Sequence, residues 1–146
     1  MKITTHSPEE TIEFAKKIGS LLVGGEVIAY RGGLGAGKTT FTRGLAIGYG
    51  LGDDVTSPTF ALVNEYRKEK KRLCHFDMYR ISGNADLETT GFYDYMDGEN
   101  VLAIEWSENI EDALPDNTIY ITLNRIDDDT REIEIIGDER FENIGH

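Results

Sequence analysis

The sequence is poor in cysteine, in basic residues and in long apolar runs, and each shortage excludes a class of protein. Its single cysteine, Cys74, excludes an internal disulfide framework and most cysteine-based zinc sites. No apolar run approaches the roughly 20 residues of a membrane-spanning helix, and the N-terminus lacks the basic-then-apolar pattern of a secretory signal. Internal repeats and low-complexity linkers are absent as well. We therefore expect a soluble, cytoplasmic protein.

Positive charge is scarce and unevenly distributed. The 15 Lys and Arg side chains are outnumbered by 27 Asp and Glu, which gives a formal net charge of −12. Such a chain is unsuited to holding a long nucleic-acid duplex on a uniformly basic face. Five cations nevertheless cluster with only Glu69 between them, namely Arg67, Lys68, Lys70, Lys71 and Arg72. A solvated hairpin turn and a local contact with RNA or a protein partner both remain open as interpretations.

The apolar content is sufficient for a folded core. The chain has 146 residues, 39% of them hydrophobic and 10% aromatic, which suits one globular domain. Residues 1–146 are therefore predicted to form a single domain, whose tail from about Asp138 onward frays.

Periodicity predicts alternating helices and strands. Ser7, Pro8 and Glu10 form a helix-start pattern, and Gly24-Gly25 is expected to end that helix. A second long helix is predicted over Thr39–Tyr49 and a short one over Asn109–Leu114. Strands are predicted over Val27–Tyr30, Leu62–Tyr66, Leu73–Tyr79, Val101–Ile104, Thr118–Leu123 and Glu132–Ile136. The basic cluster would join the second and third strands as one hairpin, and the last two strands would form another.

A phosphate-binding loop follows the first predicted strand. Residues 32–39 have the sequence G-G-L-G-A-G-K-T, which satisfies G-x-x-x-x-G-K-[ST] at every constrained position. Glycines allow backbone N–H groups to turn toward phosphate oxygens, and the N-terminus of the following helix adds partial positive charge. In this pattern Lys38 contacts the β- and γ-phosphates, and the hydroxyl of Thr39 can bind Mg²⁺.

Two carboxylates are candidates for the acidic residue that such a site needs. Glu105 follows the apolar run Val101–Ile104, where a buried strand is expected to emerge. Asp77 ends a less apolar run, and it would either orient a water molecule or act as a base that does not bind the metal directly. Strand character favours Glu105 as the carboxylate on the metal side.

The sequence gives little support for guanine recognition. Residues 124–127 are N-R-I-D and loosely match the N-K-x-D motif, but residues 75–80, H-F-D-M-Y-R, lack the glycine of the D-x-x-G motif. The first match is better explained as a hairpin end, so ATP is expected over GTP. A small-molecule kinase and a nucleotide-gated assembly module stay as alternatives to an ATPase. The kinase would need an acceptor pocket and a lid, for which the chain has little length left.

Four motifs together resemble one known family. They are Gly32–Thr40 (G-G-L-G-A-G-K-T-T), Ser57–Phe60 (S-P-T-F), His75–Arg80 (H-F-D-M-Y-R) and Ile104–Trp106 (I-E-W). The combination resembles the bacterial TsaE family, the small ATPase of tRNA threonylcarbamoyladenosine (t6A) biosynthesis. The resemblance extends from about Thr11 to Trp106 and continues weakly through the terminal hairpin.

The resemblance implies an α/β fold of the P-loop nucleoside-triphosphatase type, with a central mixed, mainly parallel sheet flanked by helices and a C-terminal β-hairpin. It implies ATP and Mg²⁺ as cofactors. The implied partners are the threonylcarbamoyl-transferase subunit TsaD and its partner TsaB. The expected function is a Mg²⁺-dependent ATPase that binds and resets this transferase complex, with an indirect or local contact to tRNA.

The resemblance also implies roles for individual residues. Lys38, Asp77 and Glu105 would be catalytic, with Asp77 needed for hydrolysis. Thr39 and Glu105 would bind Mg²⁺, and residues 57–60 would form a switch loop. The nucleotide would lie against Thr11, Gly35, Ala36, Gly37, Lys38, Thr39, Thr40 and Arg131.

Gly33 and Trp106 bear on the rate of hydrolysis and on partner contacts, respectively. Gly33 stands where the family usually has an acidic residue, so hydrolysis is expected to be slower or differently tuned. Trp106, directly after Glu105, fits either a core aromatic or a contact with a switch element or the partner protein.

Overall fold

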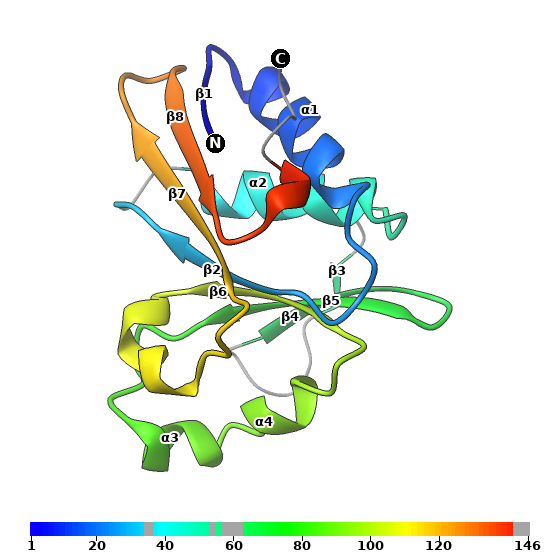
Figure 1. Ribbon diagram of the computed structural model, residues 1–146, viewed down its shortest axis with the longest axis vertical. Helices are drawn as coiled ribbons and strands as arrows, with labels where there is room; N and C mark the ends of the chain where they lie inside the picture. The colour runs from blue at the N-terminus through cyan, green and yellow to red at the C-terminus, as the bar shows by residue number, and fades with distance from the viewer. Residues whose placement is uncertain (34–36, 53–54, 57–62, 142–146) are drawn as a thin grey trace.

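A single eight-stranded sheet organises the chain in the computed structural model, which describes residues 1–33, 37–52, 55–56 and 63–141. The strand order is β1-β8-β7-β2-β6-β5-β4-β3 (Figure 1). The strands are β1 (Lys2–Thr5), β2 (Val27–Arg31), β3 (Val55–Thr56), β4 (Val63–Lys68), β5 (Lys71–Asp77), β6 (Val101–Glu105), β7 (Ile119–Arg125) and β8 (Arg131–Ile136). The central strands β7, β2, β6 and β5 are parallel, and antiparallel strands extend both sides. The predicted mixed sheet and C-terminal hairpin are confirmed.

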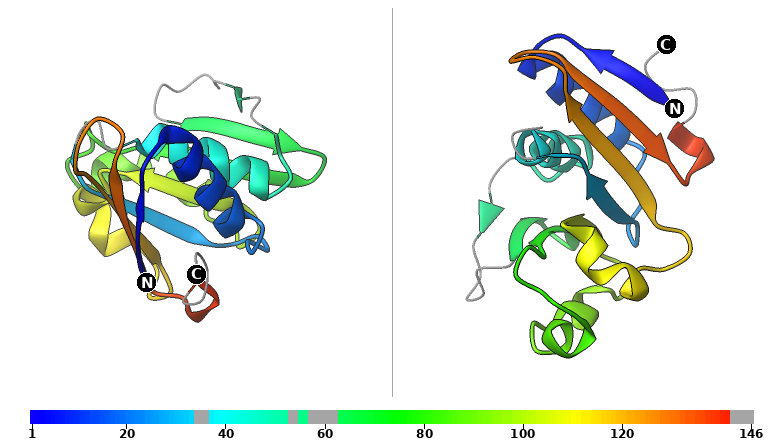
Figure 2. Two further views of the ribbon diagram at one scale, coloured as in Figure 1. Left: turned by 90° about the horizontal axis from the view of Figure 1, so that it is seen from above. Right: turned by 90° about the vertical axis from the view of Figure 1, so that its left-hand side faces the viewer.

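Helices cover both faces of this sheet (Figures 1 and 2). On one face lie α1 (Pro8–Gly19) and α2 (Lys38–Gly48), and on the other lie α3 (Asn84–Glu88), α4 (Phe92–Tyr95) and the 3₁₀ helix η1 (Ser107–Ala113). Because strand side chains alternate between faces, β2 contributes Ile28 and Tyr30 to the core under α1 and α2 and Val27 to the core on the other side. The fold is therefore a three-layer α/β arrangement.

Helix α1 begins as the sequence predicts. The Ser7 hydroxyl accepts a hydrogen bond from the Glu10 backbone N–H at 3.1 Å, and the Glu10 carboxylate accepts one from the His6 N–H at 2.9 Å. This reciprocal pair satisfies two donors that the helix start leaves without partners. The helix ends at Gly19, earlier than the predicted stop at Gly24-Gly25.

Close packing against α1 fixes the position of α2. A Cβ added to Gly48 would lie 2.1 Å from the Lys16 carbonyl oxygen, and one on Gly44 would lie 2.5 Å from the Ala15 Cβ. Larger residues at these positions would push the helices apart. Since α2 begins at Lys38, this contact also positions the predicted phosphate-binding lysine.

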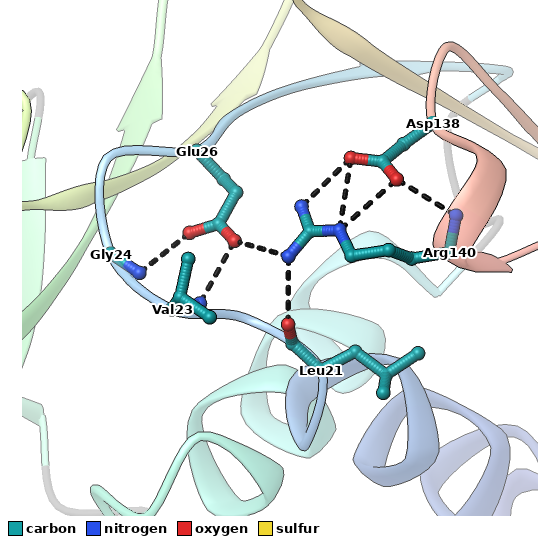
Figure 3. Close-up of polar contacts among 6 residues, drawn as sticks. All are labelled: Leu21, Val23, Gly24, Glu26, Asp138 and Arg140. Carbon is teal, nitrogen blue, oxygen red and sulfur yellow. Dashed lines mark hydrogen bonds and ion pairs between the residues drawn. The ribbon is translucent and has the colours of Figure 1, made fainter.

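The C-terminal segment folds back onto the face of the sheet that α1 and α2 cover (Figure 1). Residues 138–141, which the sequence places in a fraying tail, include the 3₁₀ turn η2 (Glu139–Phe141), and Phe141 is buried. Arg140 donates hydrogen bonds to the Leu21 carbonyl at 2.8 Å and to the carboxylates of Glu26 at 3.0 Å and Asp138 at 2.7 Å (Figure 3).

Among the described residues, no helix is long and apolar enough to cross a bilayer.

Candidate functional site

Three predicted site residues, Lys38, Asp77 and Glu105, lie where the parallel strands β2, β5 and β6 end. The carboxyl edge of a parallel sheet is the usual ligand site of α/β folds. Here β2 ends at Arg31, β5 at Asp77 and β6 at Glu105, and α2 starts beside them with Lys38. Gly35 and Ala36, two of the predicted phosphate-binding residues, lie outside the described residues.

Gly32 and Lys38 close the base of the loop between β2 and α2. The Lys38 ammonium donates a hydrogen bond to the Gly32 carbonyl at 2.8 Å. Gly32 has φ +118°, and a Cβ there would lie 1.9 Å from the Leu123 carbonyl oxygen of the neighbouring strand β7. Both the left-handed backbone and the close approach therefore require glycine at this position.

Glu105 is the half-buried carboxylate of the site. Its Oε2 accepts a hydrogen bond from Nε2 of His75 at 2.7 Å, and the two side chains are 21% and 7% exposed. Burial alone would raise the pKa of Glu105, but the hydrogen bond with His75 and the charges of His75 and Lys38 outweigh it and lower the pKa below its usual value. Glu105 is thus ionised at neutral pH and is stabilised in that form by the charge of Lys38.

A buried polar chain connects this carboxylate to α2. The His75 ring meets the Tyr30 ring edge to face, with centroids 6.3 Å apart. Tyr30 Oη lies 2.8 Å from Thr42 Oγ1, and the Thr42 hydroxyl donates to the Lys38 carbonyl at 2.8 Å. Since threonine has one hydroxyl hydrogen, Tyr30 must be the donor to Thr42, and burial raises the Tyr30 pKa and keeps that proton in place. Sequence reasoning missed Tyr30 and Thr42; the only signal was the position of Thr42 one turn after Lys38.

Asp77 lies beside Glu105 in a different environment. The two residues are directly opposed in the parallel pairing of β5 and β6. Asp77 is exposed, and its Oδ1 accepts a hydrogen bond from the Tyr79 backbone N–H at 3.0 Å. The site therefore combines a shielded carboxylate that is hydrogen-bonded to His75 with one open to solvent.

A small pocket brings together residues from α1, α2 and β8. It is lined by Pro8, Thr11, Gly37, Thr40, Asp128, Asp129 and Arg131. Four of these, Thr11, Gly37, Thr40 and Arg131, are predicted nucleotide neighbours. The Thr11 hydroxyl is already engaged, 2.7 Å from the Thr5 hydroxyl and 3.2 Å from the Ser7 carbonyl. Arg131 donates to the Asp127 carbonyl at 2.7 Å, and its Nε would be 3.8 Å from a Cβ on Gly37.

The donor set of the site suits Mg²⁺ held in part by a ligand. Within the part of the chain that the structure describes, no three His, Cys, Asp or Glu side chains gather in a metal-binding cluster. Mg²⁺ commonly binds through one or two protein oxygens, substrate phosphates and water. The ionised Glu105 and the exposed Thr39 hydroxyl at the start of α2 offer such oxygens.

Three other predictions concern residues 124–127, Trp106 and residues 57–60. Residues 124–127 end β7 and enter its turn, where the Asp127 carboxylate accepts hydrogen bonds from the Asp129 and Thr130 N–H groups, so the hairpin-end interpretation is confirmed. Trp106 has a left-handed backbone, with φ 59°. Its ring packs against that of Tyr79, and the two ring centroids are 4.9 Å apart. Residues 57–60, the predicted switch loop, lie outside the described residues.

Comparison with known proteins identifies the family. Residues 5–133 match the profile described as "Threonylcarbamoyl adenosine biosynthesis protein TsaE". The chain is 41% identical to the Bacillus subtilis tRNA threonylcarbamoyladenosine biosynthesis protein TsaE over 91% of this chain and 83% of that protein. It is 36% identical to the Treponema pallidum protein of the same name, over 92% and 99% of the two chains.

A solved structure agrees with this assignment. The crystal structure of YdiB from Bacillus subtilis superposes with a TM-score of 0.75 at 36% identity, covering 97% of this chain and 88% of that one. The family profile, the curated relatives and the fold therefore agree, and the chain belongs to the TsaE family of threonylcarbamoyladenosine biosynthesis proteins.

Proposed function

We propose that this protein binds ATP with Mg²⁺ and hydrolyses it in support of t6A modification of tRNA. The observation that carries the proposal is the placement of Lys38 beside the ionised Glu105 at the carboxyl ends of β2 and β6. This pairing follows directly on a complete phosphate-loop sequence. A cation for phosphate oxygens thus lies near enough to a carboxylate for a metal ion to lower the pKa of that carboxylate.

The lysine is available for phosphate. Its ammonium rests on the neutral Gly32 carbonyl. Exchanging that carbonyl for a phosphate oxygen replaces a hydrogen bond to a neutral group with a stronger charge-assisted one. The N-terminus of α2 directs further N–H groups at the same region, where anions are favoured.

Two protein oxygens would hold the metal and a third group would act on water. Glu105 and Thr39 would bind Mg²⁺, which when present supplies positive charge to the β- and γ-phosphate oxygens. His75 would keep Glu105 in place. Asp77, exposed and in register with Glu105, would orient the attacking water and accept its proton.

The pocket containing Arg131 would accommodate the remainder of the nucleotide. Its rim carries Asp128 and Asp129 beside Arg131. Carboxylates repel phosphate but accept hydrogen bonds from hydroxyl and amino groups. The mixed charge of this rim therefore suits a sugar or base better than a phosphate.

Family membership supports the cellular setting. The relatives are named for tRNA threonylcarbamoyladenosine biosynthesis. We infer that the protein acts in the cytoplasm with the threonylcarbamoyl-transferase subunit TsaD and its partner TsaB, and that hydrolysis resets their complex. A kinase would instead pass the phosphate to an acceptor, so phosphate release without an acceptor separates the two activities.

Calorimetry with the Lys38→Ala variant tests the nucleotide assignment. Removing the ammonium should weaken Mg²⁺–ATP binding at least about 10-fold, since a charge-assisted hydrogen bond contributes roughly 1.5–3 kcal/mol. The control is Lys17→Ala, which removes an exposed lysine of α1 and should leave affinity unchanged. GTP at equal concentration should displace little ATP from the wild type. Unchanged affinity in Lys38→Ala would refute the phosphate-binding role.

A further inference from the structure

The turn between β4 and β5 is positively charged, whereas the chain as a whole is acidic. We call residues 67–72 the basic hairpin. In its antiparallel register Arg67 lies directly opposite Arg72, and Lys68 lies directly opposite Lys71. Like charges in directly opposed positions destabilise a sheet. Folding thus places two pairs of like charges opposite each other, although acidic residues outnumber basic ones in the chain as a whole.

The two cations on β5 are held by the body of the protein. The Arg72 guanidinium donates to the Glu65 carboxylate at 2.7 Å and to the Asn100 side-chain carbonyl at 3.1 Å. The Lys71 ammonium donates to the Tyr49 carbonyl at 3.2 Å and lies 4.7 Å from the centre of the Tyr49 ring. These contacts give both side chains a structural role.

The three remaining cations have no such role. Arg67, Lys68 and Lys70 are exposed, and none of their side chains makes a hydrogen bond or ion pair with any residue that the structure describes. The tip of the hairpin projects from the sheet (Figures 1 and 2). A bound polyanion would offset the repulsion between the opposed pairs.

We propose that Arg67, Lys68 and Lys70 contact the phosphate backbone of RNA. The large exposed apolar side chains of the described residues are Val23, Tyr79, Tyr93, Ile126 and Ile136, none of which is on the hairpin. A protein interface normally has an apolar centre, which is missing here. Tyr66, which precedes the hairpin, and Tyr49, which contacts Lys71, are both buried, and the Tyr95 ring already packs against Arg72, so none of the three is free to stack on a base. Contacts limited to phosphates position a nucleic acid without reading its sequence.

The contact would be local and separate from the candidate nucleotide site. The net charge of −12 repels RNA over most of the surface, but charges farther away than about 10 Å are largely screened at 0.1 M salt. Lys71 and Asp77 are the two ends of β5, about 20 Å apart for an extended strand. Only the identity of the RNA, a tRNA, rests on the proposed function.

Anisotropy of a fluorescent, unmodified tRNA transcript titrated with the protein tests this proposal. Three phosphate contacts should make log K fall with log salt with a slope of about −2.1 to −2.7, which weakens binding about 20- to 40-fold between 50 and 200 mM salt. The variant Arg67→Ala/Lys68→Ala/Lys70→Ala should lose this salt-dependent binding. Its melting temperature should not fall, because the repulsive pairs are gone.

A charge-matched control separates the hairpin from net charge. The variant Lys2→Ala/Lys16→Ala/Lys17→Ala also removes three cations and should keep the wild-type slope. The proposal would be overturned if the wild type did not bind tRNA at 50 mM salt, or if both variants lost tRNA binding equally. It would also be overturned if the hairpin variant lost binding to poly-glutamate but kept its binding to tRNA. ATP affinity, measured on the same samples, should be unchanged in both. A wild type that binds tRNA but not ATP would refute the nucleotide assignment alone.

Discussion

At the scale of single residues, the two carboxylates of the site differ through their surroundings. Asp77 and Glu105 are direct neighbours across two parallel strands. Glu105 is half-buried, bonded to His75 and faced by Lys38, whereas Asp77 is exposed. A shielded, ionised carboxylate suits a metal ion, and an exposed carboxylate can reach water. The separate roles that we propose for them therefore rest on their different environments.

Substituting the two carboxylates separately tests this division. Asp77→Asn should leave Mg²⁺–ATP affinity within a few-fold and reduce turnover by about 10²-fold or more, the usual scale for a positioned base. Glu105→Ala should instead weaken the Mg²⁺ dependence of nucleotide binding. Both are measured by calorimetry and phosphate release with the partner proteins present. If Asp77→Asn loses the metal dependence and Glu105→Ala retains it, the roles are reversed.

The sequence could nominate these residues but not their contacts. Lys38 and Glu105 were predicted because a loop motif and an apolar strand mark them locally. The His75–Glu105 hydrogen bond joins residues 30 positions apart, and no local pattern encodes it. The same holds for Tyr30 and Thr42, whose bond depends on how α2 packs on β2.

At the scale of elements, one arginine fastens the C-terminal turn to the loop before β2. Glu26 is 7% exposed and accepts hydrogen bonds from the Val23 and Gly24 N–H groups besides that from Arg140. On the other side, the hydrogen bond from Arg140 lowers the pKa of Asp138. The guanidinium thus connects two carboxylates and the Leu21 carbonyl (Figure 3).

Arg140→Met should destabilise the fold by about 2 kcal/mol, because a buried carboxylate loses a charged partner. The group with the depressed pKa is Asp138, so its contribution is present above its ordinary pKa of about 3.9 and is lost as the pH falls through the lower folded value. The difference from wild type should therefore be largest above about pH 5 and shrink toward pH 2. Urea unfolding across this range measures it.

The control for that experiment is Arg125→Met. Arg125 pairs with the exposed Asp128 at the β7–β8 turn, and such pairs contribute about 0–1 kcal/mol. An equal loss in both variants, or a loss in Arg140→Met that persists undiminished at pH 2, would argue against the Arg140 contacts as the cause.

Elements with strong periodicity were predictable and short ones were not. The sequence indicated α1, α2, β2, β6 and the C-terminal hairpin within a few residues. It missed β1, whose four residues pair with β8 more than 120 positions away. It also missed α3 and α4, which have five and four residues and no side-chain cap. Their formation depends on tertiary packing, as the burial of Leu87 and Phe92 shows.

At the scale of the whole molecule, the sheet separates two charged regions. The candidate nucleotide site lies at the carboxyl ends of the parallel strands, and the basic hairpin lies at the amino end of β5. The exposed Tyr79, whose ring contacts that of the half-buried Trp106, borders the first region. Such a layout leaves room for a protein partner near the nucleotide and for RNA at the other end.

A retention experiment tests how the molecule as a whole acts. Immobilised protein should retain the threonylcarbamoyl-transferase subunits more strongly with Mg²⁺–ATP than without it, because a partner at the carboxyl edge would sense the bound phosphates. Asp77→Asn should retain them in ATP but release them slowly, since release would require hydrolysis. Lys38→Ala, which should not bind ATP productively, is the matched control and should show no response to nucleotide.

The same variants then separate resetting from simple gating in a tRNA modification assay. If hydrolysis resets the complex, Asp77→Asn should support a first round of t6A formation and fail in later rounds. If nucleotide binding alone gates assembly, Asp77→Asn should modify tRNA through many rounds as the wild type does, while Lys38→Ala fails from the start. Sustained modification by Asp77→Asn, with phosphate release abolished, would therefore refute the proposed resetting role and leave nucleotide binding as the function of the site.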